Sequence, residues 1–415
     1  MRQWMVAAKK ADFYVIAEKF HVDPVVARII RNREVIGEKN IRIYLGGNLS
    51  DLSDPHQMKD MDRLVEILAQ KIRKQVHIRI IGDYDVDGVT SSHLFLTALR
   101  RVGAKVDVVI PHRIQDGYGL SLHLLQQAKE DGVDTILTCD NGIAAIDEIA
   151  WAKAQKMTVL VTDHHAVPFE EHEGRRTEKK SLADAVVNPH QQDCGYPYKE
   201  LCGAGVAWNV IRVLYENYDM DKREAEDLLD FVAMATVCDV MSLTGENRIL
   251  VKEGLKRIRH TKNIGLQALM QACNVQPENI SAYHFGYVLG PCVNATGRLD
   301  TARHALRLFE TGQETEAEEI ARDLVDLNQE RKELTLQGVE MAKKLCEEGG
   351  YENDPVLVLF LPDVHESIAG LIAGRIREMY NRPVFVLTRG EEGVKGSGRS
   401  TENYSMYENM CGCAE

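Results

Sequence analysis

Three aspartates at alternate positions follow a short apolar strand in the first quarter of the chain. Residues 82–88 read Gly-Asp-Tyr-Asp-Val-Asp-Gly, and the segment from Val76 to Ile81 before them is predicted to be a β-strand. Carboxylates this close repel one another by several kcal/mol at an effective dielectric constant of about 20, unless cations lie among them. Asp83, Asp85 and Asp87 are therefore candidate ligands of a hard metal ion.

The spacing of these aspartates also occurs in calcium-binding loops. Such a loop needs a glutamate about five residues after its glycine and helices on both sides. Position 93 is His93 and a predicted strand precedes the aspartates, so the sequence argues against this loop. The carboxyl end of a parallel strand is instead the usual place for a ligand site in an open α/β sheet.

Three further predicted elements end in residues that bind hard metals. These residues are Asp140 after the strand 135–138, Asp163, His164 and His165 after the strand 158–161, and Asp239 at the end of the helix 225–238. Each one alone would more often be a turn or helix-cap residue. Their recurrence at matching strand ends favours a common metal site.

The types of these residues indicate which metal and which chemistry to expect. Oxygen-rich ligation with one or two imidazoles suits Mn²⁺ or Mg²⁺, whereas Zn²⁺ favours more His or Cys. Shared carboxylates suggest two ions roughly 3.5–4 Å apart, which activate water and stabilise an in-line displacement at phosphorus. The residues themselves predict a two-metal hydrolase of phosphoesters or phosphoanhydrides.

The elements that must position these residues alternate between strands and helices from residue 76 to residue 187. This order is typical of βαβ units and predicts an α/β fold with a mainly parallel sheet. We expect these divisions: a helical lead-in at 1–72, a catalytic domain at 73–312 (sheet 73–190, helical part 200–312), a long helix at 313–347, and a second, smaller α/β domain at 348–415. The long helix has a narrow apolar stripe, so it either connects two lobes or packs as an ordinary helix.

The composition limits the class of protein and its location. The 415 residues are 44% hydrophobic and 27% charged, with a net charge of −13, which argues against a protein that coats nucleic acid by bulk charge. A locally basic groove remains compatible with this charge. No apolar run approaches the roughly 18 residues of a membrane span. Residues 1–4 run into charged sequence without an apolar export core, and nine scattered cysteines fit a reduced, cytoplasmic compartment.

The four acidic segments, taken in order, resemble a known family. Gly-Asp-Tyr-Asp-Val-Asp-Gly, Thr-Cys-Asp-Asn-Gly, Thr-Asp-His-His-Ala and Val-Cys-Asp resemble the motifs of the DHH phosphoesterase superfamily. Across nearly the whole chain, the resemblance is strongest to the RecJ branch of single-strand-specific, 5′ to 3′ DNA exonucleases. Related pyrophosphatases and dinucleotide phosphodiesterases carry a histidine four residues before the first Asp of D-x-D. Ile81 stands there in this chain and Asp83 adds a carboxylate, which favours the RecJ branch.

The resemblance implies a role for each acidic or histidine residue. The implied ligands of the two Mn²⁺ or Mg²⁺ ions are Asp83, Asp85, Asp87, Asp140, His164 and Asp239. His165 would contact the scissile phosphate or assist the leaving oxygen, and Asp163 would orient a histidine. Activated water would attack the phosphorus and release 5′-mononucleotides.

Two further segments resemble phosphate-binding motifs of the family. Arg298, at the end of Asn-Ala-Thr-Gly-Arg, matches an arginine that contacts substrate phosphate near the active site. Residues 395–400 (Lys-Gly-Ser-Gly-Arg-Ser) match the glycine-rich motif that holds the 5′ phosphate, which implicates Ser397 and Arg399. Residues 365–375, with small residues at helical spacing, match the same domain of the family and make Arg375 a weaker candidate. Small residues let the backbone approach an anion, and arginine binds it through two N–H groups. Considered alone, Arg298 would more often form a surface salt bridge, and residues 395–400 could equally be a hairpin turn.

The sequence also departs from the family. Family members continue to a Gly-Gly-His segment and an OB-fold, so we expect this chain to be partial, with an incomplete second domain. The main functional prediction is a 5′ to 3′ exonuclease of single-stranded DNA in repair or recombination, with a single-strand-binding protein or a helicase as possible partners. One alternative is a phosphodiesterase of short oligonucleotides or nucleotides. Another is a non-catalytic scaffold in a replication or repair complex, against which the complete ligand set counts.

Overall fold

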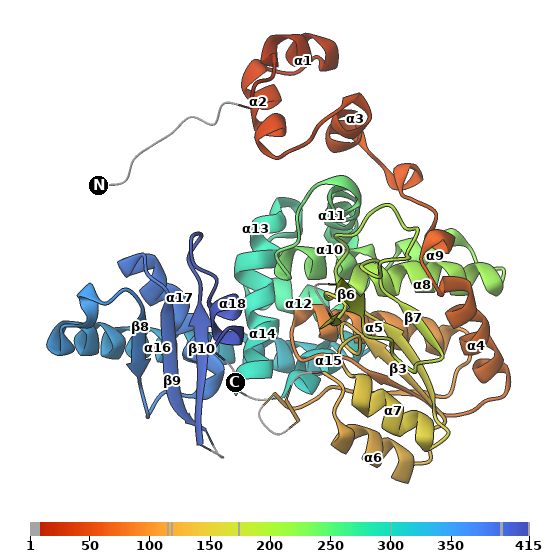
Figure 1. Cartoon of the computed structure of the whole chain (residues 1–415). Coiled ribbons are helices and arrows are strands. Elements are labelled where there is room, and N and C mark those ends of the chain that lie inside the picture. The colour runs from red at the N-terminus through yellow and green to blue at the C-terminus, as the bar shows by residue number, and fades with distance from the viewer. Residues whose placement is uncertain are drawn as a thin grey trace.

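The chain folds into a large lobe, a small lobe and an N-terminal group of helices (Figure 1). The computed structural model describes residues 9–113, 116–117, 119–172, 175–299, 301–390 and 393–413. The outer limits of the first and last predicted domains, residues 1 and 415, lie outside this part of the chain. None of the helices in the described residues is both long and apolar enough to cross a membrane.

Five of the described strands form the parallel sheet of the large lobe, in the order β2-β1-β3-β4-β7. They are β1 (Ile78–Ile81), β2 (Val106–Val109), β3 (Thr135–Cys139), β4 (Thr158–Thr162) and β7 (Ala185–Val187). Ile81 pairs with Thr138, which in turn pairs with Val161, so β1, β3 and β4 end at nearly the same level. The predicted α/β fold with a mainly parallel sheet is confirmed.

Alternate residues of the central strands face two hydrophobic cores. Ile80, Leu137 and Leu160 belong to one core, and their neighbours Ile81 and Ile136 belong to the other. The first core is covered by α4 (Met61–Arg73), α5 (Val86–Arg101), α8 (Gly203–Asn217) and α10 (Leu229–Cys238), and the second by α6 (Leu122–Glu130) and α7 (Ile146–Ala154). Because both faces are covered, the strands are mostly apolar, as expected for parallel strands. The buried Arg79 of β1 is an exception, and it pairs with Asp107 of β2.

Helices complete the large lobe after the sheet. They are α9 (Lys222–Glu226), α10, α11 (Gly245–Arg257), α12 (Ile264–Ala272), α13 (Ala282–His284), α14 (Gly290–Leu299) and α15 (Ala302–Glu310), with a π-helical turn, η5 (Phe285–Leu289), directly before α14. The helix predicted at 225–238 starts later than expected, because α9 ends at Glu226 and α10 begins only at Leu229, but it ends at Cys238 as predicted. Short 3₁₀ turns occur at η1 (Leu49–Asp51), η2 (Pro55–Gln57), η3 (Ile258–His260) and η4 (Pro277–Asn279).

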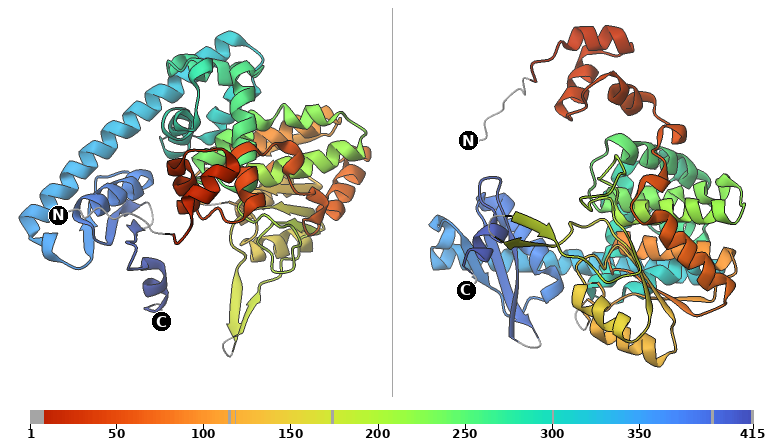
Figure 2. Two further views of the ribbon diagram at one scale, coloured as in Figure 1. Left: turned by 90° about the horizontal axis from the view of Figure 1, so that it is seen from above. Right: turned by 45° about the vertical axis from the view of Figure 1, so that its right-hand side comes forward.

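A single 36-residue helix, α16 (Glu314–Gly349), runs from the large lobe to the small lobe (Figure 2). At 1.5 Å per residue it is about 54 Å long. Its first half packs on α12, α14 and α15, and its second half packs on the small lobe. Both interpretations of this segment therefore hold, since the helix joins the lobes and also contributes to the core of each.

The small lobe contains a three-stranded sheet covered by one helix. Its elements are η6 (Tyr351–Asn353), β8 (Leu357–Phe360), η7 (Glu366–Ile368), α17 (Ala369–Tyr380), β9 (Val384–Gly390), β10 (Gly393–Arg399) and α18 (Met406–Cys411). Strand β9 is central, parallel to β8 and antiparallel to β10. The glycine-rich residues 395–399 thus lie on an edge strand and not in a turn.

Two regions differ from the sequence-based expectation. The helical segment predicted near residues 11–33 consists of α1 (Phe13–Phe20) and α2 (Pro24–Asn32), because His21 adopts a left-handed φ of 54° and Asp23 caps the second helix. Together with α3 (Glu38–Gly46), they surround a small separate core. The second difference is a hairpin of β5 (Phe169–His172) and β6 (Arg175–Glu178), which projects from the large lobe (Figure 2). Its charged sequence lacks the apolar alternation that predicts strands.

Candidate active site

The turn after β1 carries three aspartates and leads into α5. Asp85 is the N-cap of α5, and its carboxylate accepts hydrogen bonds from the backbone N–H groups of Asp87 (2.9 Å) and Gly88 (3.1 Å). A Cβ atom at Gly88 would lie 2.4 Å from the carbonyl oxygen of Asp83, so only glycine fits. The turn therefore depends on both residue types, the capping aspartate and the glycine.

Asp87 lies at the N-terminus of a second helix. Its carboxylate is buried and accepts hydrogen bonds from the backbone N–H groups of Gly203 (2.6 Å) and Ala204 (2.8 Å), the first residues of α8. The positive end of a helix dipole stabilises a carboxylate in this position. Sequence reasoning missed this contact, because it joins residues 116 positions apart.

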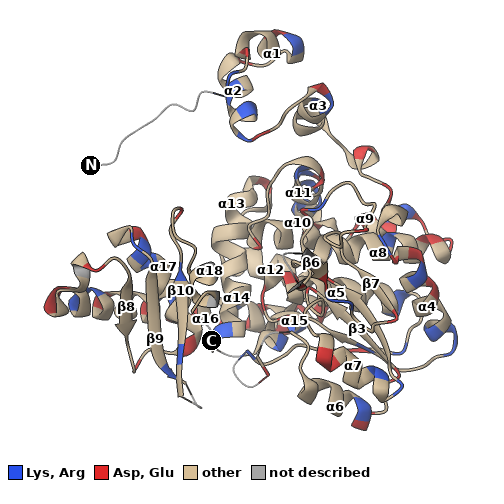
Figure 3. Cartoon of the chain, viewed as in Figure 1, with Lys and Arg blue, Asp and Glu red and all other residues tan. Residues whose placement is uncertain are grey.

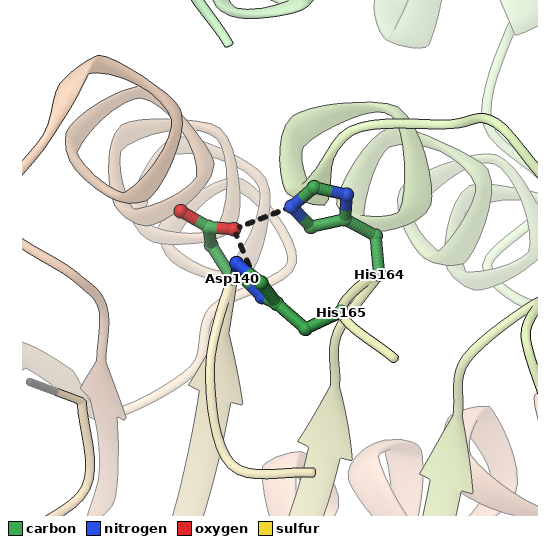
Figure 4. A group of neighbouring side chains, drawn as sticks. All are labelled: Asp140, His164 and His165. Atoms are coloured by element: carbon green, nitrogen blue, oxygen red, sulfur yellow. Dashed lines mark ion pairs between the residues drawn. The ribbon is translucent and has the colours of Figure 1, made fainter. Parts of the chain in front are cut away.

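Asp140, His164 and His165 converge at the ends of β3 and β4 (Figure 4). Asp140 follows β3 with a left-handed φ of 61°. Its Oδ1 atom lies 3.1 Å from Nε2 of His164 and 4.0 Å from Nδ1 of His165. Asp239 directly follows α10 and places Oδ2 3.7 Å from the same His164 nitrogen, and Oδ2 of Asp87 lies 3.6 Å from it.

Asp163 fixes the positions of His164 and His165 through hydrogen bonds. Its Oδ1 atom accepts hydrogen bonds from the backbone N–H groups of His164 (2.7 Å) and His165 (3.0 Å), and lies 2.8 Å from Nδ1 of His165. Its other oxygen accepts a hydrogen bond from the N–H of Ile143 (2.9 Å). Burial would raise the pKa of Asp163, but these hydrogen bonds lower it overall, and the hydrogen bond with Asp163 raises the pKa of His165 to about 9.

The candidate metal ligands form two neighbouring groups. Asp87, His164 and Asp239 offer ligand atoms within 4.8 Å of one another, as do Asp83, Asp85 and Asp140. The structure thus brings together all six predicted metal ligands, as two adjacent groups linked by the 3.1 Å contact between Asp140 and His164.

Electrostatics make this cluster suitable for divalent cations. Burial raises the pKa of Asp83 to about 8, with a further contribution from Asp85, and burial together with Asp87 does the same for the pKa of Asp239. Oδ1 of Asp83, Oδ2 of Asp239 and Nε2 of His164 are buried and have no hydrogen-bond partner in the described part of the chain. Divalent cations would satisfy these atoms, so the residues fit Mn²⁺ or Mg²⁺.

Helix α14 places Arg298 between this cluster and the small lobe. Oδ1 of Asn294 accepts a hydrogen bond from the N–H of Val86 (3.1 Å), and a Cβ atom at Gly297 would lie 2.4 Å from the carbonyl oxygen of Tyr84. The helix therefore rests directly on the aspartate turn. Nη1 of Arg298 donates a hydrogen bond to the carbonyl of Ser367 in η7 (2.6 Å), and burial lowers the pKa of Arg298 to about 10.

Ser397 and Arg399 lie on β10, against the start of α17. Nη1 of Arg399 donates a hydrogen bond to Oγ of Ser397 (3.1 Å). A Cβ atom at Gly370 would lie 2.7 Å from Nη2 of Arg399 and 2.8 Å from that Oγ, so the glycine makes room for both side chains. The charge of Arg399 contributes to lowering the pKa of Arg298, after burial and the charges of other arginines. The predicted phosphate contacts Arg298, Ser397 and Arg399 thus lie in one region.

A cavity of about 200 Å³ lies between the lobes in this region. It is lined by Tyr84, Arg113, Gly117, Glu366, Ser367, Lys395 and Gly396. The guanidinium of Arg113 lies 4.7 Å from the centre of the Tyr84 ring. Sequence reasoning missed Arg113, although its place shortly after β2 follows the same strand-end rule that identified the aspartates. Charged residues of both signs are scattered over the outer helices (Figure 3). The positive charge that Arg113 and Lys395 bring to this cavity is therefore local and not part of a basic surface.

Arg375 lies apart from the other predicted phosphate contacts. Gly370 and Arg375 are five residues apart on α17, which places them about 140° apart around the helix axis. Arg375 lines a separate cavity of about 650 Å³ together with Arg331 and Lys332 of α16. The structure therefore does not bring Arg375 together with Ser397 and Arg399.

Comparisons with known proteins agree with this fold and site. Residues 77–236 match the family model described as "DHH family, N-terminal domain". The single-stranded-DNA-specific exonuclease RecJ of Haemophilus influenzae is 36% identical over 399 residues, covering 93% of this chain and 67% of the relative.

Solved structures match as well. A crystal structure of exonuclease RecJ bound to manganese is 32% identical, with a TM-score of 0.72 and 85% of each chain covered. RecJ of Thermus thermophilus in complex with Mn²⁺ is 29% identical, with a TM-score of 0.79. This match covers 97% of this chain and 55% of the Thermus chain. The same Thermus protein has been solved with Mg²⁺.

The parallel sheet, the Asp-His-His segment and the converging carboxylates define a DHH-type phosphoesterase. Such an enzyme uses divalent metals to hydrolyse phosphoesters. The identity to its relatives specifies the branch: the chain belongs to the RecJ family of single-stranded-DNA-specific exonucleases.

Proposed function

We propose that this chain hydrolyses single-stranded DNA from its 5′ end to 5′-mononucleotides, using two Mn²⁺ or Mg²⁺ ions. The observation that carries the proposal is the position of His164. Its Nε2 atom lies 3.6 Å from Asp87, 3.1 Å from Asp140 and 3.7 Å from Asp239, although these residues come from four separate elements.

Six side chains would hold the metals: Asp83, Asp85, Asp87, Asp140, His164 and Asp239. When bound, the two ions activate the attacking water and neutralise charge on the phosphoryl oxygens. Helix α8 holds Asp87 through two backbone N–H groups and so orients its oxygens before a metal arrives. Asp163 fixes the ring of His165, which contacts the scissile phosphate or assists the leaving oxygen.

The residues between the lobes would bind the end of the strand. Arg298 presents a half-buried guanidinium beside the aspartate turn, and Ser397 with Arg399 offers a hydroxyl and a second guanidinium to the 5′ phosphate. Arg375 is exposed on a different face of α17, so its contribution would be a weaker contact with the strand. The division at 73–312, 313–347 and 348–415 assigns metal binding to the large lobe and end recognition to the small lobe.

Other parts of the proposal follow from the family alone. A single-strand-binding protein or a helicase would deliver the substrate, and the cytoplasm would be the compartment. The scattered cysteines are consistent with a reducing environment, since those described are free thiols.

Digestion of end-labelled single strands with and without a 5′ phosphate, in Mn²⁺, tests the function. We expect mononucleotides released from the 5′ end, faster from phosphorylated strands, and no product after chelation. Asp140→Ala should lower the rate by more than about a hundredfold, since loss of an outer partner of a ligand already costs 10–100-fold. Full activity of Asp140→Ala would refute the proposal.

The alternatives give different results in the same assay. Faster turnover of dinucleotides than of long strands would indicate a phosphodiesterase of short oligonucleotides. Absence of both Mn²⁺ binding and turnover would indicate a non-catalytic scaffold. Duplex DNA of the same sequence is the control for single-strand specificity.

A further inference from the structure

Val240 follows the predicted metal ligand Asp239 and has an unusual backbone conformation. Its φ of 58° is left-handed. The N–H of Val240 donates to the carbonyl of Val237 (3.2 Å) and the N–H of Met241 to that of Thr236 (3.2 Å). These bonds end α10 in a Schellman motif, whose left-handed position strongly favours glycine. A β-branched residue there is strained.

The valine is exceptional among residues in this conformation. The other described non-glycine residues with positive φ are all polar or charged: Lys10, His21, Glu34, Asp60, Gln75, Asp140, Lys156, Asp219, Asn274 and Asn381. Val240 is also 87% exposed, so burial in a core does not compensate for the strain. Neither backbone preference nor packing in the fold explains a valine at this position.

The position of Val240 suggests what the side chain is for. Asp239, whose Oδ2 lies 3.7 Å from Nε2 of His164, is the residue directly before Val240, so the backbone of Val240 continues from a residue of the metal centre. A cationic side chain here would be attracted to the carboxylates and compete with metals, and an anionic one would repel phosphate. An apolar side chain avoids both effects and can still pack against a sugar or a base.

We propose that the isopropyl group of Val240 contacts the sugar or base of the nucleotide bound at the metal centre. The inference rests on the proposed function, and it adds a substrate contact that does not involve charge. Proteins that bind single strands without sequence preference contact the faces of the bases, for which aromatic side chains are the usual partners. An exposed aliphatic side chain offers a smaller apolar surface for the same purpose. Strained residues persist where they serve a site, and here the strain would be tolerated for strand binding.

Val240→Gly tests this contact, with Lys156→Gly as the matched control. Lys156 ends α7 in the same motif, with φ 66° and hydrogen bonds from Lys156 to Lys153 (2.9 Å) and from Met157 to Ala152 (3.1 Å). Both variants should raise the midpoint of thermal unfolding by about 2 °C, because both relieve a left-handed side chain.

Only Val240→Gly should weaken strand binding. We expect KM for a 5′-phosphorylated oligo-dT in Mn²⁺, and Kd for the fluorescently labelled strand without metal, to rise about tenfold. The kcat and the affinity for Mn²⁺ should stay unchanged, since the contact binds substrate and transition state equally. Lys156→Gly should change none of these quantities.

Unchanged KM and Kd in Val240→Gly would overturn the inference, and so would a lower unfolding midpoint, which would assign Val240 a structural role. If the parent protein binds the strand without cleaving it, the proposed function fails while the comparison of Kd still decides on Val240. A parent protein that neither binds nor cleaves the strand overturns both.

Discussion

Asp230, at the start of α10, is a buried carboxyl group outside the metal cluster. It is 4% exposed, and its two oxygens accept hydrogen bonds from Oγ1 of Thr261 (2.6 Å) and from the N–H of Phe231 (2.9 Å). Burial raises the pKa of Asp230 to about 6, although these bonds act in the opposite direction. The carboxyl is therefore protonated more readily in the folded chain than in the unfolded one.

The raised pKa of Asp230 makes the stability of the folded chain depend on pH. Because the pKa of Asp230 is raised from 3.8 to about 6, its contribution to stability is complete below about pH 4 and is lost as the pH rises through 6. Asp230→Asn removes this loss, so between pH 4 and pH 8 the parent should lose about 2 kcal/mol more stability than the variant. Urea unfolding at each pH measures the difference. Parallel stability curves would contradict it.

At the scale of residues, the sequence identified the candidate metal ligands because each follows a predicted strand or helix, and strand ends meet at one edge of a parallel sheet. The same reasoning could not place Arg375, because small residues at helical spacing do not show which face of the helix the arginine occupies. It also could not anticipate the left-handed φ of Val240, because β-branched residues rarely adopt that conformation.

At the scale of elements, the N-terminus of α8 is the support of the cluster. Gly203 donates to Asp87, and a Cβ atom on it would lie 2.6 Å from Cβ of Asp140. Gly203→Ala should therefore displace α8 or Asp140 and lower Mn²⁺ affinity and turnover by about tenfold to a hundredfold. Isothermal titration with Mn²⁺ and the nuclease assay measure the two effects.

A glycine two residues further along α8 is the control. A Cβ atom at Gly205 would lie 3.4 Å from its nearest neighbours, which is an ordinary contact with Leu201. Gly205→Ala adds the same methyl group to the same helix and should leave Mn²⁺ affinity unchanged. Equal effects of the two substitutions would mean that α8 tolerates the methyl group poorly for reasons unrelated to the metal site.

The elements themselves were predictable where apolar periodicity is strong. The strands and helices from β1 to β4 follow that pattern, and α16 differs from its prediction by one or two residues at its ends. The hairpin of β5 and β6 was not predictable, because its charged sequence lacks the apolar alternation that predicts strands. The support of Asp87 by α8 was not predictable either, because a tertiary contact across 116 residues leaves no local signal.

At the scale of the whole molecule, activity should depend on how α16 holds the two lobes. Metal ligands lie on the large lobe and Ser397 with Arg399 on the small lobe, so the helix sets the distance between metal and 5′ phosphate. The hydrogen bond from Arg298 to Ser367 is a second, local link between the lobes (2.6 Å). A rigid helix of this length is an effective spacer only while it remains straight.

Glu330→Pro tests this dependence. Glu330 is exposed and lies between the stretch of α16 that packs on the large lobe, ending near Asn328, and the stretch that packs on the small lobe, starting near Gly338. Proline there removes a helical hydrogen bond and kinks the helix. A misplacement of about 1 Å can cost a hundredfold in rate, so turnover of oligonucleotides should fall by about that factor. Mn²⁺ affinity should persist, because every candidate ligand lies on the large lobe.

Glu330→Ala, which keeps the helix straight, should behave as the parent protein does. If Glu330→Pro retained full turnover, the lobes would be held together by their direct contacts, and α16 would be only a tether.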